Sequence, residues 1–127
     1  MKTTTFARRL ALLAGALDLC TGIGLTFLPR LTLELMLVPG PDKQALVYLR
    51  FIGAFVAAVG ASYLWALARP VERLRVVFGA TLLFRSFVGT FCLVAVITGQ
   101  LPPAWLTVAI TDLGLAAAQG WLLRSPE

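Results

Sequence analysis

Long apolar stretches separated by short breaks form the dominant pattern along the chain. Four stretches, at about residues 8–28, 44–68, 74–98 and 103–123, consist mostly of Leu, Val, Ile, Phe, Ala and Gly. Each has roughly the 20 apolar residues that a helix needs to cross a hydrocarbon layer about 30 Å thick. Because backbone N–H and C=O groups must be paired in lipid, we expect each stretch to be an α-helix. The pattern predicts an all-α fold, an integral membrane four-helix bundle that forms a single transmembrane domain over residues 1–127.

A shorter apolar segment lies between the first two stretches. Leu31–Val38 is too short to cross a membrane, carries Glu34 and is flanked by prolines. Such a segment suits a helical turn or two lying at the membrane interface. An extended cap over the bundle is equally consistent, and the alternating leucines at positions 31–37 also permit a strand. The sequence leaves the conformation of residues 29–43 open.

The basic residues between the stretches predict how the chain is oriented. Two of them, Arg30 and Lys43, fall on one side of the membrane, and seven fall on the side of the termini: Lys2, Arg8, Arg9, Arg69, Arg73, Arg75 and Arg124. Because cytoplasmic loops are enriched in Lys and Arg, we expect both termini in the cytoplasm. The even number of spans agrees with this orientation.

Composition also indicates a membrane protein. Hydrophobic residues make up 59% of the chain, charged residues make up 13%, and the mean hydropathy is +0.88. This leaves too little polar surface to cover a globule in water. The formal net charge of +5 does not indicate nucleic acid, because the basic residues form no stripe with interleaved aromatics. We therefore expect the lipid bilayer as a partner, and no nucleic acid.

Each predicted span contains one charged residue: Asp18, Arg50, Arg85 and Asp112. A charge at the centre of a bilayer costs roughly 2.5–3.5 kcal/mol on insertion scales, so these residues need partners inside the bundle. Two arrangements are open: Asp18, Asp112 and Arg85 can form one polar cluster, or each acid can hold one arginine, Arg85 or Arg50. Arg50 lies nearer the end of its span, where it can either reach the headgroups or turn toward the acids. Two roles are open for these charges. They can be purely structural and fix the packing of the helices, or they can bind a ligand, an ion or a proton.

Helical spacing indicates which faces point inward. Gln119 shares a face of the fourth span with Trp105 and Asp112, and it joins the candidate site for that reason. The other predicted inward faces are Ala14, Asp18 and Gly22 in the first span, Arg50, Ala54, Ala57 and Ala61 in the second, and Thr81, Arg85, Gly89 and Cys92 in the third. In the second span Gly53 and Gly60 lie beside the stripe, where they let neighbouring backbones approach closely. Aromatic residues near the ends of the spans, Tyr63 among them, are expected to anchor the chain at the membrane interface.

Motifs for catalysis, metal binding and cofactor binding are absent from the sequence. The chain has no histidine, and its two cysteines, Cys20 and Cys92, lie in separate apolar runs without C-x-x-C spacing. This argues against haem, most zinc and copper sites, and thiol redox chemistry. Nucleotide-binding and hydrolase signatures are also missing. We expect no cofactor or metal, and a non-enzymatic protein.

Several segments together resemble the DoxX-like group of small bacterial membrane proteins. They are Ala16–Pro29, Val38–Pro41, Tyr48–Gly53, Ala68–Pro70 and Thr111–Leu113, which extend over nearly the whole chain but have low specificity. The resemblance implies a four-helix protein of the bacterial inner membrane, in which a basic residue of the third span and an Asp of the fourth recur, matched here by Arg85 and Asp112. For DoxX itself it implies a membrane subunit of a sulfur-oxidising, quinone-reducing complex. No thiosulfate or quinone site is identified in this chain.

Three functional hypotheses follow from the sequence. The leading one is an accessory membrane protein whose Asp/Arg cluster binds an amphipathic small molecule of the lipid or quinone type, or stabilises a larger membrane complex. The second is a small proton- or ion-coupled transporter that works as a homodimer. The third is a membrane enzyme that acts on a lipid or a quinone.

Overall fold

The computed structural model describes residues 1–126, which are mostly helical. A short helix, α2 (Pro29–Leu35), and a 3-10 turn, η1 (Pro103–Trp105), accompany four long helices: α1 (Thr5–Phe27), α3 (Lys43–Leu67), α4 (Pro70–Ile97) and α5 (Leu106–Arg124). No strand occurs within residues 1–126. The predicted all-α fold is confirmed, and the alternative of a strand at positions 31–37 is wrong.

The long helices have the length and surface of membrane-spanning segments. The helical segments contain 23, 25 and 28 residues in α1, α3 and α4, and 22 residues in η1 and α5 together, and all four are apolar enough to cross a bilayer. Large apolar side chains lie exposed on them, including Phe51, Phe55, Phe84, Phe87 and Phe91. An apolar surface of this extent is expected where the surrounding solvent is lipid. The chain is therefore a multi-pass membrane protein.

Capping residues and prolines determine where the helices begin. Thr4 Oγ1 accepts a hydrogen bond from Ala7 N at the start of α1, and Asp42 Oδ1 accepts one from Ala45 N at the start of α3. Pro70 is the first residue of α4. An N–H at this position has no partner within the helix, so proline can lack it at no cost. The predicted second span, 44–68, differs from α3 by one residue at each end. α1 and α4 begin three and four residues before the predicted spans, because apolar content does not mark the polar first turn of a helix.

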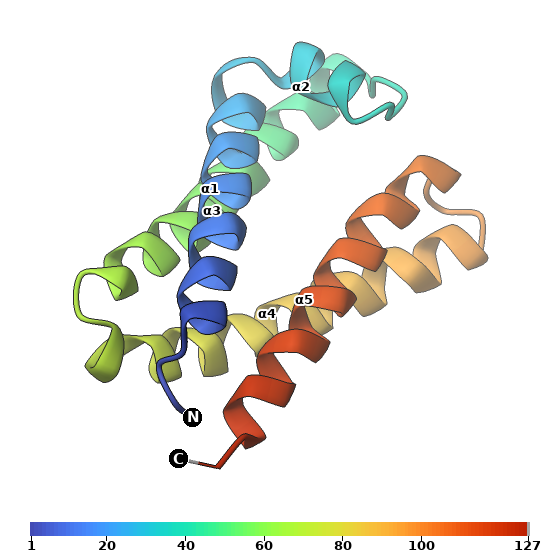
Figure 1. Ribbon diagram of the computed structural model, residues 1–127. Helices are drawn as coiled ribbons and strands as arrows, with labels where there is room; N and C mark the ends of the chain where they lie inside the picture. The colour runs from blue at the N-terminus through green and yellow to red at the C-terminus, as the bar shows by residue number, and fades with distance from the viewer. Residues whose placement is uncertain (127) are drawn as a thin grey trace.

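The four long helices form two hairpins. α1 packs along α3 and α4 packs along α5, whereas contacts between the hairpins are fewer and run mainly from α3 to α4. The hairpins meet at the end of the molecule that carries both termini, and they diverge toward the end that carries α2 and η1 (Figure 1). We call these the termini end and the loop end. At the termini end the rings of Phe6 and Trp121 lie edge to face, with their centroids 6.2 Å apart.

Glycines bring the first hairpin into backbone contact. A Cβ added to Gly22 of α1 would lie 2.2 Å from Ala57 N, and one added to Gly60 of α3 would lie 2.3 Å from Leu19 N. Neither position can hold a side chain without moving a helix. Small residues serve this role in membrane proteins, where packing between helices replaces the hydrophobic effect.

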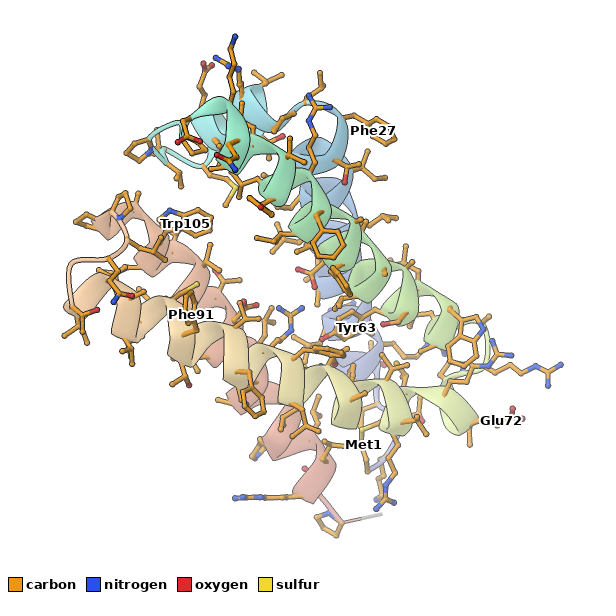
Figure 2. All side chains as sticks on the ribbon, turned by 180° about the vertical axis from the view of Figure 1, so that it is seen from behind. Met1, Phe27, Tyr63, Glu72, Phe91 and Trp105 are labelled. Atoms are coloured by element: carbon orange, nitrogen blue, oxygen red, sulfur yellow. The ribbon has the colours of Figure 1, made fainter. Side chains whose placement is uncertain are left out.

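Two apolar clusters lie at opposite ends of the molecule. The cluster at the termini end takes residues from all four long helices: Ala7, Ala11, Ala14, Tyr63, Ala66, Leu74, Val77, Phe78 and Leu122. The cluster at the loop end is built by α1, α2, α3 and the connection between them, from Leu25, Leu33, Val38, Leu46 and Leu49. In the described part of the chain, the second hairpin adds to it only the half-buried Ala104 and Trp105. Figure 2 shows Trp105 on the side of the second hairpin that faces the first.

The connection between α1 and α3 contains α2, which the sequence left open. Leu33 of α2 is buried, whereas Leu35 and Leu37 are exposed. The helix ends with Val38 N donating to Leu33 O at 2.9 Å and Leu37 N donating to Glu34 O at 3.0 Å. This closure places Leu37 in the left-handed region, with φ of 59°, a conformation that favours glycine.

Candidate functional site

Arg85 of α4 is the centre of a buried ion-pair cluster. Its Nη2 lies 2.5 Å from Asp18 Oδ2 of α1, and its Nη1 lies 2.5 Å from Asp112 Oδ1 of α5. Its Nε donates a hydrogen bond to the Tyr63 hydroxyl of α3 at 3.0 Å. The Arg85 side chain is 3% exposed. A single guanidinium therefore binds one side chain from each of the other three long helices.

The hydrogen-bond network continues from Tyr63 toward the termini end. Gln119 Nε2 of α5 donates to the Tyr63 hydroxyl at 2.7 Å and to Thr81 Oγ1 of α4 at 2.9 Å. Thr81 Oγ1 in turn donates to Val77 O in its own helix at 2.6 Å. Gln119 is 1% exposed, and its Oε1 has no hydrogen-bond partner among the described residues. The network thus ends in a buried acceptor that remains available to a water molecule or another donor.

The polar network joins the two hairpins. Asp18 and Tyr63 come from the first hairpin, and Arg85, Asp112 and Gln119 come from the second. The bonds from Arg85 to Asp18 and to Tyr63 therefore cross from one hairpin to the other, as does the bond from Gln119 to Tyr63. Tyr63 lies where the two hairpins come together (Figure 2). The network borders the apolar cluster at the termini end, to which Tyr63 also belongs.

The ion-pair cluster carries more negative than positive charge. Two carboxylates share one guanidinium, which leaves a formal charge of −1 when both acids are ionised. Each carboxylate uses one oxygen for Arg85, and the second oxygen makes no hydrogen bond with the described residues. The Asp18 and Asp112 side chains are 14% and 17% exposed. The cluster can therefore accept a cation or hydrogen-bond donors on its partly exposed carboxylate oxygens.

Arg50 lies outside this cluster. Its side chain is exposed on α3, eight residues into the helix from the loop end, and it forms no ion pair with the described residues. Of the two arrangements left open by the sequence, the single cluster of both acids with Arg85 is confirmed, and the arrangement of two separate ion pairs is wrong. An arginine near the end of a span can reach the headgroups by extending its side chain, so α3 does not have to turn Arg50 toward the acids.

Three of the four predicted inward faces are confirmed. Ala14 and Gly22 are buried beside Asp18, the predicted stripe of Thr81, Arg85, Gly89 and Cys92 is buried along α4, and Gln119 is buried on α5. The predicted stripe of α3 is wrong, because Arg50, Ala54 and Ala61 are exposed there. The close backbone approach predicted at Gly53 and Gly60 is confirmed. The buried face of α3 consists instead of Leu46, Leu49, Gly53, Gly60, Tyr63 and Ala66.

Tyr63 is the site residue that sequence analysis missed. It was assigned to the membrane interface, yet it is fully buried and bonds to both Arg85 and Gln119. Its spacing from Gly53 and Gly60 does place it on the glycine face of α3. Had that face been taken as the inward one, the sequence would have placed Tyr63 inside the bundle and Arg50 outside it.

Comparisons of the chain with models of protein families, with curated proteins and with solved structures give no match. Any functional assignment must therefore come from the site itself.

Proposed function

We propose that the protein binds an amphipathic cation from the bilayer, with its positively charged group held between Asp18 and Asp112. The observation that carries this proposal is the unbalanced charge of the cluster, where two carboxylates face one guanidinium. A net charge within the hydrocarbon layer is costly, by about 2.5–3.5 kcal/mol on insertion scales. A bound cation removes that cost.

The accessible oxygens of the cluster fit such a ligand. Each carboxylate keeps one oxygen free of Arg85, and both side chains are partly exposed while Arg85 is not. An ammonium group can donate charged hydrogen bonds to such free carboxylate oxygens, and these bonds strengthen in a medium of low dielectric constant. The long helices expose large apolar side chains along their length, so the apolar part of the ligand would remain in the surrounding lipid.

The wider setting of this proposal comes from the sequence. The excess of Lys and Arg at the termini end supports cytoplasmic termini. We place the protein in the bacterial inner membrane, and its assignment as DoxX-like stays a prediction that rests on the segments quoted above. In this membrane the protein would act as an accessory binding protein. It would do so either as a homodimer or as part of a larger membrane complex.

Equilibrium binding of a lipophilic cation tests the proposal. Radiolabelled dodecylammonium, whose headgroup donates hydrogen bonds, would be titrated against the full chain in lipid nanodiscs, with decylubiquinone as the neutral amphipathic comparison. We expect Asp18→Asn and Asp112→Asn each to weaken binding of the cation by about tenfold or more, the value of one charged hydrogen bond. Either variant leaves one carboxylate for Arg85, so the helical structure should be retained.

Arg50→Gln is the matched control, because it changes a charged residue of a spanning helix outside the cluster. We expect it to leave binding of the cation unchanged. Equal losses in the Asp18→Asn and Arg50→Gln variants would contradict the proposal, as would tighter binding of decylubiquinone than of the cation.

A specific observation also favours the second candidate, a proton- or ion-coupled transporter. One of the two acids that would hold the cation, Asp18, is also the group through which the first hairpin binds Arg85 of the second. A cation that competes with Arg85 for a carboxylate would therefore change how the hairpins are held. In proteoliposomes, uptake of the cation driven by an imposed proton gradient and lost in Asp18→Asn would support transport. Binding without uptake would restrict the function to binding.

A further inference from the structure

We propose that a second site, at the termini end, holds the phosphate of an anionic phospholipid against Arg8 and Arg9. The site is separate from the ion-pair cluster, and the argument for it does not depend on the cation-binding function.

The site is a surface cavity between the start of α1 and the end of α3. Its volume is about 330 Å³, and it is lined by Thr5, Arg8, Arg9 and Leu12 of α1 and by Leu67 of α3. The lining therefore combines two guanidinium groups and a hydroxyl group with two leucines. Leu12 is 52% exposed, so it presents an apolar surface on the side of the cavity that continues into the membrane span.

The positive charge of this cavity is not balanced by an acidic side chain within residues 1–126. Arg8 and Arg9 are exposed and form no ion pair with the described residues. Arg69 and Arg73, in contrast, have partners within the protein. Arg69 lies 3.8 Å from Glu72, and Arg73 donates a hydrogen bond to Trp65 O at 3.2 Å and lies over the Trp65 ring. The first turn of α1 also lacks an acidic residue. Two arginines thus lie close to the positive end of a helix, an arrangement that an anion stabilises.

The position of the cavity selects a phospholipid as the source of that anion. Arg8 and Arg9 directly precede the apolar run of α1, so they lie at the depth where headgroup phosphates meet the hydrocarbon layer. A guanidinium binds phosphate oxygens in a planar, two-point geometry. Leu12 and Leu67 can then contact the first methylene groups of the acyl chains. Basic pockets between spanning helices on the cytoplasmic side bind acidic headgroups in this way.

Native mass spectrometry of the full chain in dodecyl maltoside tests the site. Phosphatidylglycerol would be added and compared with phosphatidylcholine of the same acyl chains. We expect the Arg8→Gln/Arg9→Gln variant to bind phosphatidylglycerol about 25-fold more weakly than the original chain, because each basic residue near an anionic surface contributes a factor of about five. The Arg8→Lys/Arg9→Lys variant should retain most of the affinity, which separates loss of charge from loss of fold.

The Arg30→Gln/Lys43→Gln variant is the matched control, since it removes two positive charges from the opposite end of the chain. We expect it to bind phosphatidylglycerol as the original chain does. Equal losses in the two glutamine variants would show that net charge alone attracts the lipid and would overturn the site. Displacement of the lipid by inorganic phosphate at equal concentration would assign the cavity to a free phosphate and would overturn the phospholipid assignment.

Discussion

The two hairpins are held together by different kinds of contact. In the first, a Cβ on Gly22 or Gly60 would meet backbone atoms of the partner helix at 2.2 and 2.3 Å. In the second, a Cβ on Gly89 would meet the Leu113 side chain most closely, with its Cγ at 2.7 Å and the backbone N of Leu113 farther away at 3.3 Å, and one on Gly114 would meet nothing within 4 Å. Backbone contacts cannot adjust without moving a helix, whereas a leucine can change rotamer. The first hairpin is thus the rigid one and the second is the adaptable one.

This difference shows why the polar network matters to the fold. Each hairpin has its own packing surface, but between them the apolar contact is concentrated at the termini end, with Trp105 and Ala104 as the addition at the loop end. The network around Arg85 lies between these two regions and supplies directional bonds that apolar packing in lipid cannot supply. Mutations in the network should therefore weaken the contact between the two hairpins, here called the joint. Mutations at Gly22 or Gly60 should weaken the packing within the first hairpin.

Removal of Arg85 should have the largest effect. Arg85→Leu leaves two carboxylates without a partner, and loss of one side of a buried ion pair costs about 3–5 kcal/mol. We expect the free energy of unfolding, measured by titration with sodium dodecyl sulfate in mixed micelles, to fall by about that amount. The triple variant Asp18→Asn/Arg85→Leu/Asp112→Asn should recover most of the loss, because no charge is then left unpaired. Arg50→Gln should change the free energy by less than about 0.5 kcal/mol, and an equal loss there would contradict the role of the cluster.

Substitution of Gly22 should break the rigid hairpin. Gly22→Ala forces α1 away from α3, and because the clash is with backbone atoms we expect a loss of about 3 kcal/mol or more in the same titration. Gly89→Ala in the second hairpin should cost only about 1 kcal/mol, since Leu113 can move. Gly114→Ala, which meets no neighbour, should stabilise its helix by about 0.5–1 kcal/mol. Similar losses in Gly22→Ala and Gly89→Ala would remove the distinction between the hairpins.

Loss of the Tyr63 hydroxyl should have an intermediate effect on the joint. Tyr63→Phe keeps the ring in the apolar cluster but removes the oxygen that accepts hydrogen bonds from Arg85 and Gln119. Buried donors left without an acceptor cost about 1–3 kcal/mol, and we expect a loss in that range. Thermal unfolding followed by circular dichroism measures it. Tyr48→Phe is the control, because Tyr48 is the other tyrosine of the chain and its side chain is exposed; a loss of the same size there would refute the role of Tyr63.

The smallest effects should come from the connections within the two hairpins. The first uses Leu37 at a φ of 59°, and the second uses Gly99 at a φ of 78°. Because the left-handed conformation costs a non-glycine residue about 1 kcal/mol or more, Leu37→Gly should stabilise the chain by about 1 kcal/mol. Gly99→Ala should destabilise it by a similar amount. Shifts of the same sign in both variants, measured as midpoints of thermal unfolding, would show that backbone conformation does not control either connection.

The sequence predicts the helices better than it predicts the site, for physical reasons. Helix bounds follow from local features such as Pro70, the Asp42 cap and apolar content, and all of these can be found without knowing the partner of each helix. Which of the two predicted arrangements forms, one cluster around Arg85 or two separate ion pairs, depends on the angle between the hairpins, which no local feature encodes. The structure places three charges in the cluster and leaves Arg50 exposed near one end of its helix, which is one of the two positions that the sequence allowed for it.

The single guanidinium at the joint also imposes an order on assembly in the membrane. Asp18 precedes Arg85 by 67 positions and Asp112 follows it by 27. With synthesis at about 5–20 residues per second, the nascent chain holds Asp18 without its counter-ion for on the order of ten seconds. The glycine contacts of α1 and α3 need nothing from α4, so the first hairpin can assemble during this interval. Asp112 lies in α5, which is synthesised after α4, so the ion-pair cluster can be completed only after the first hairpin has been made.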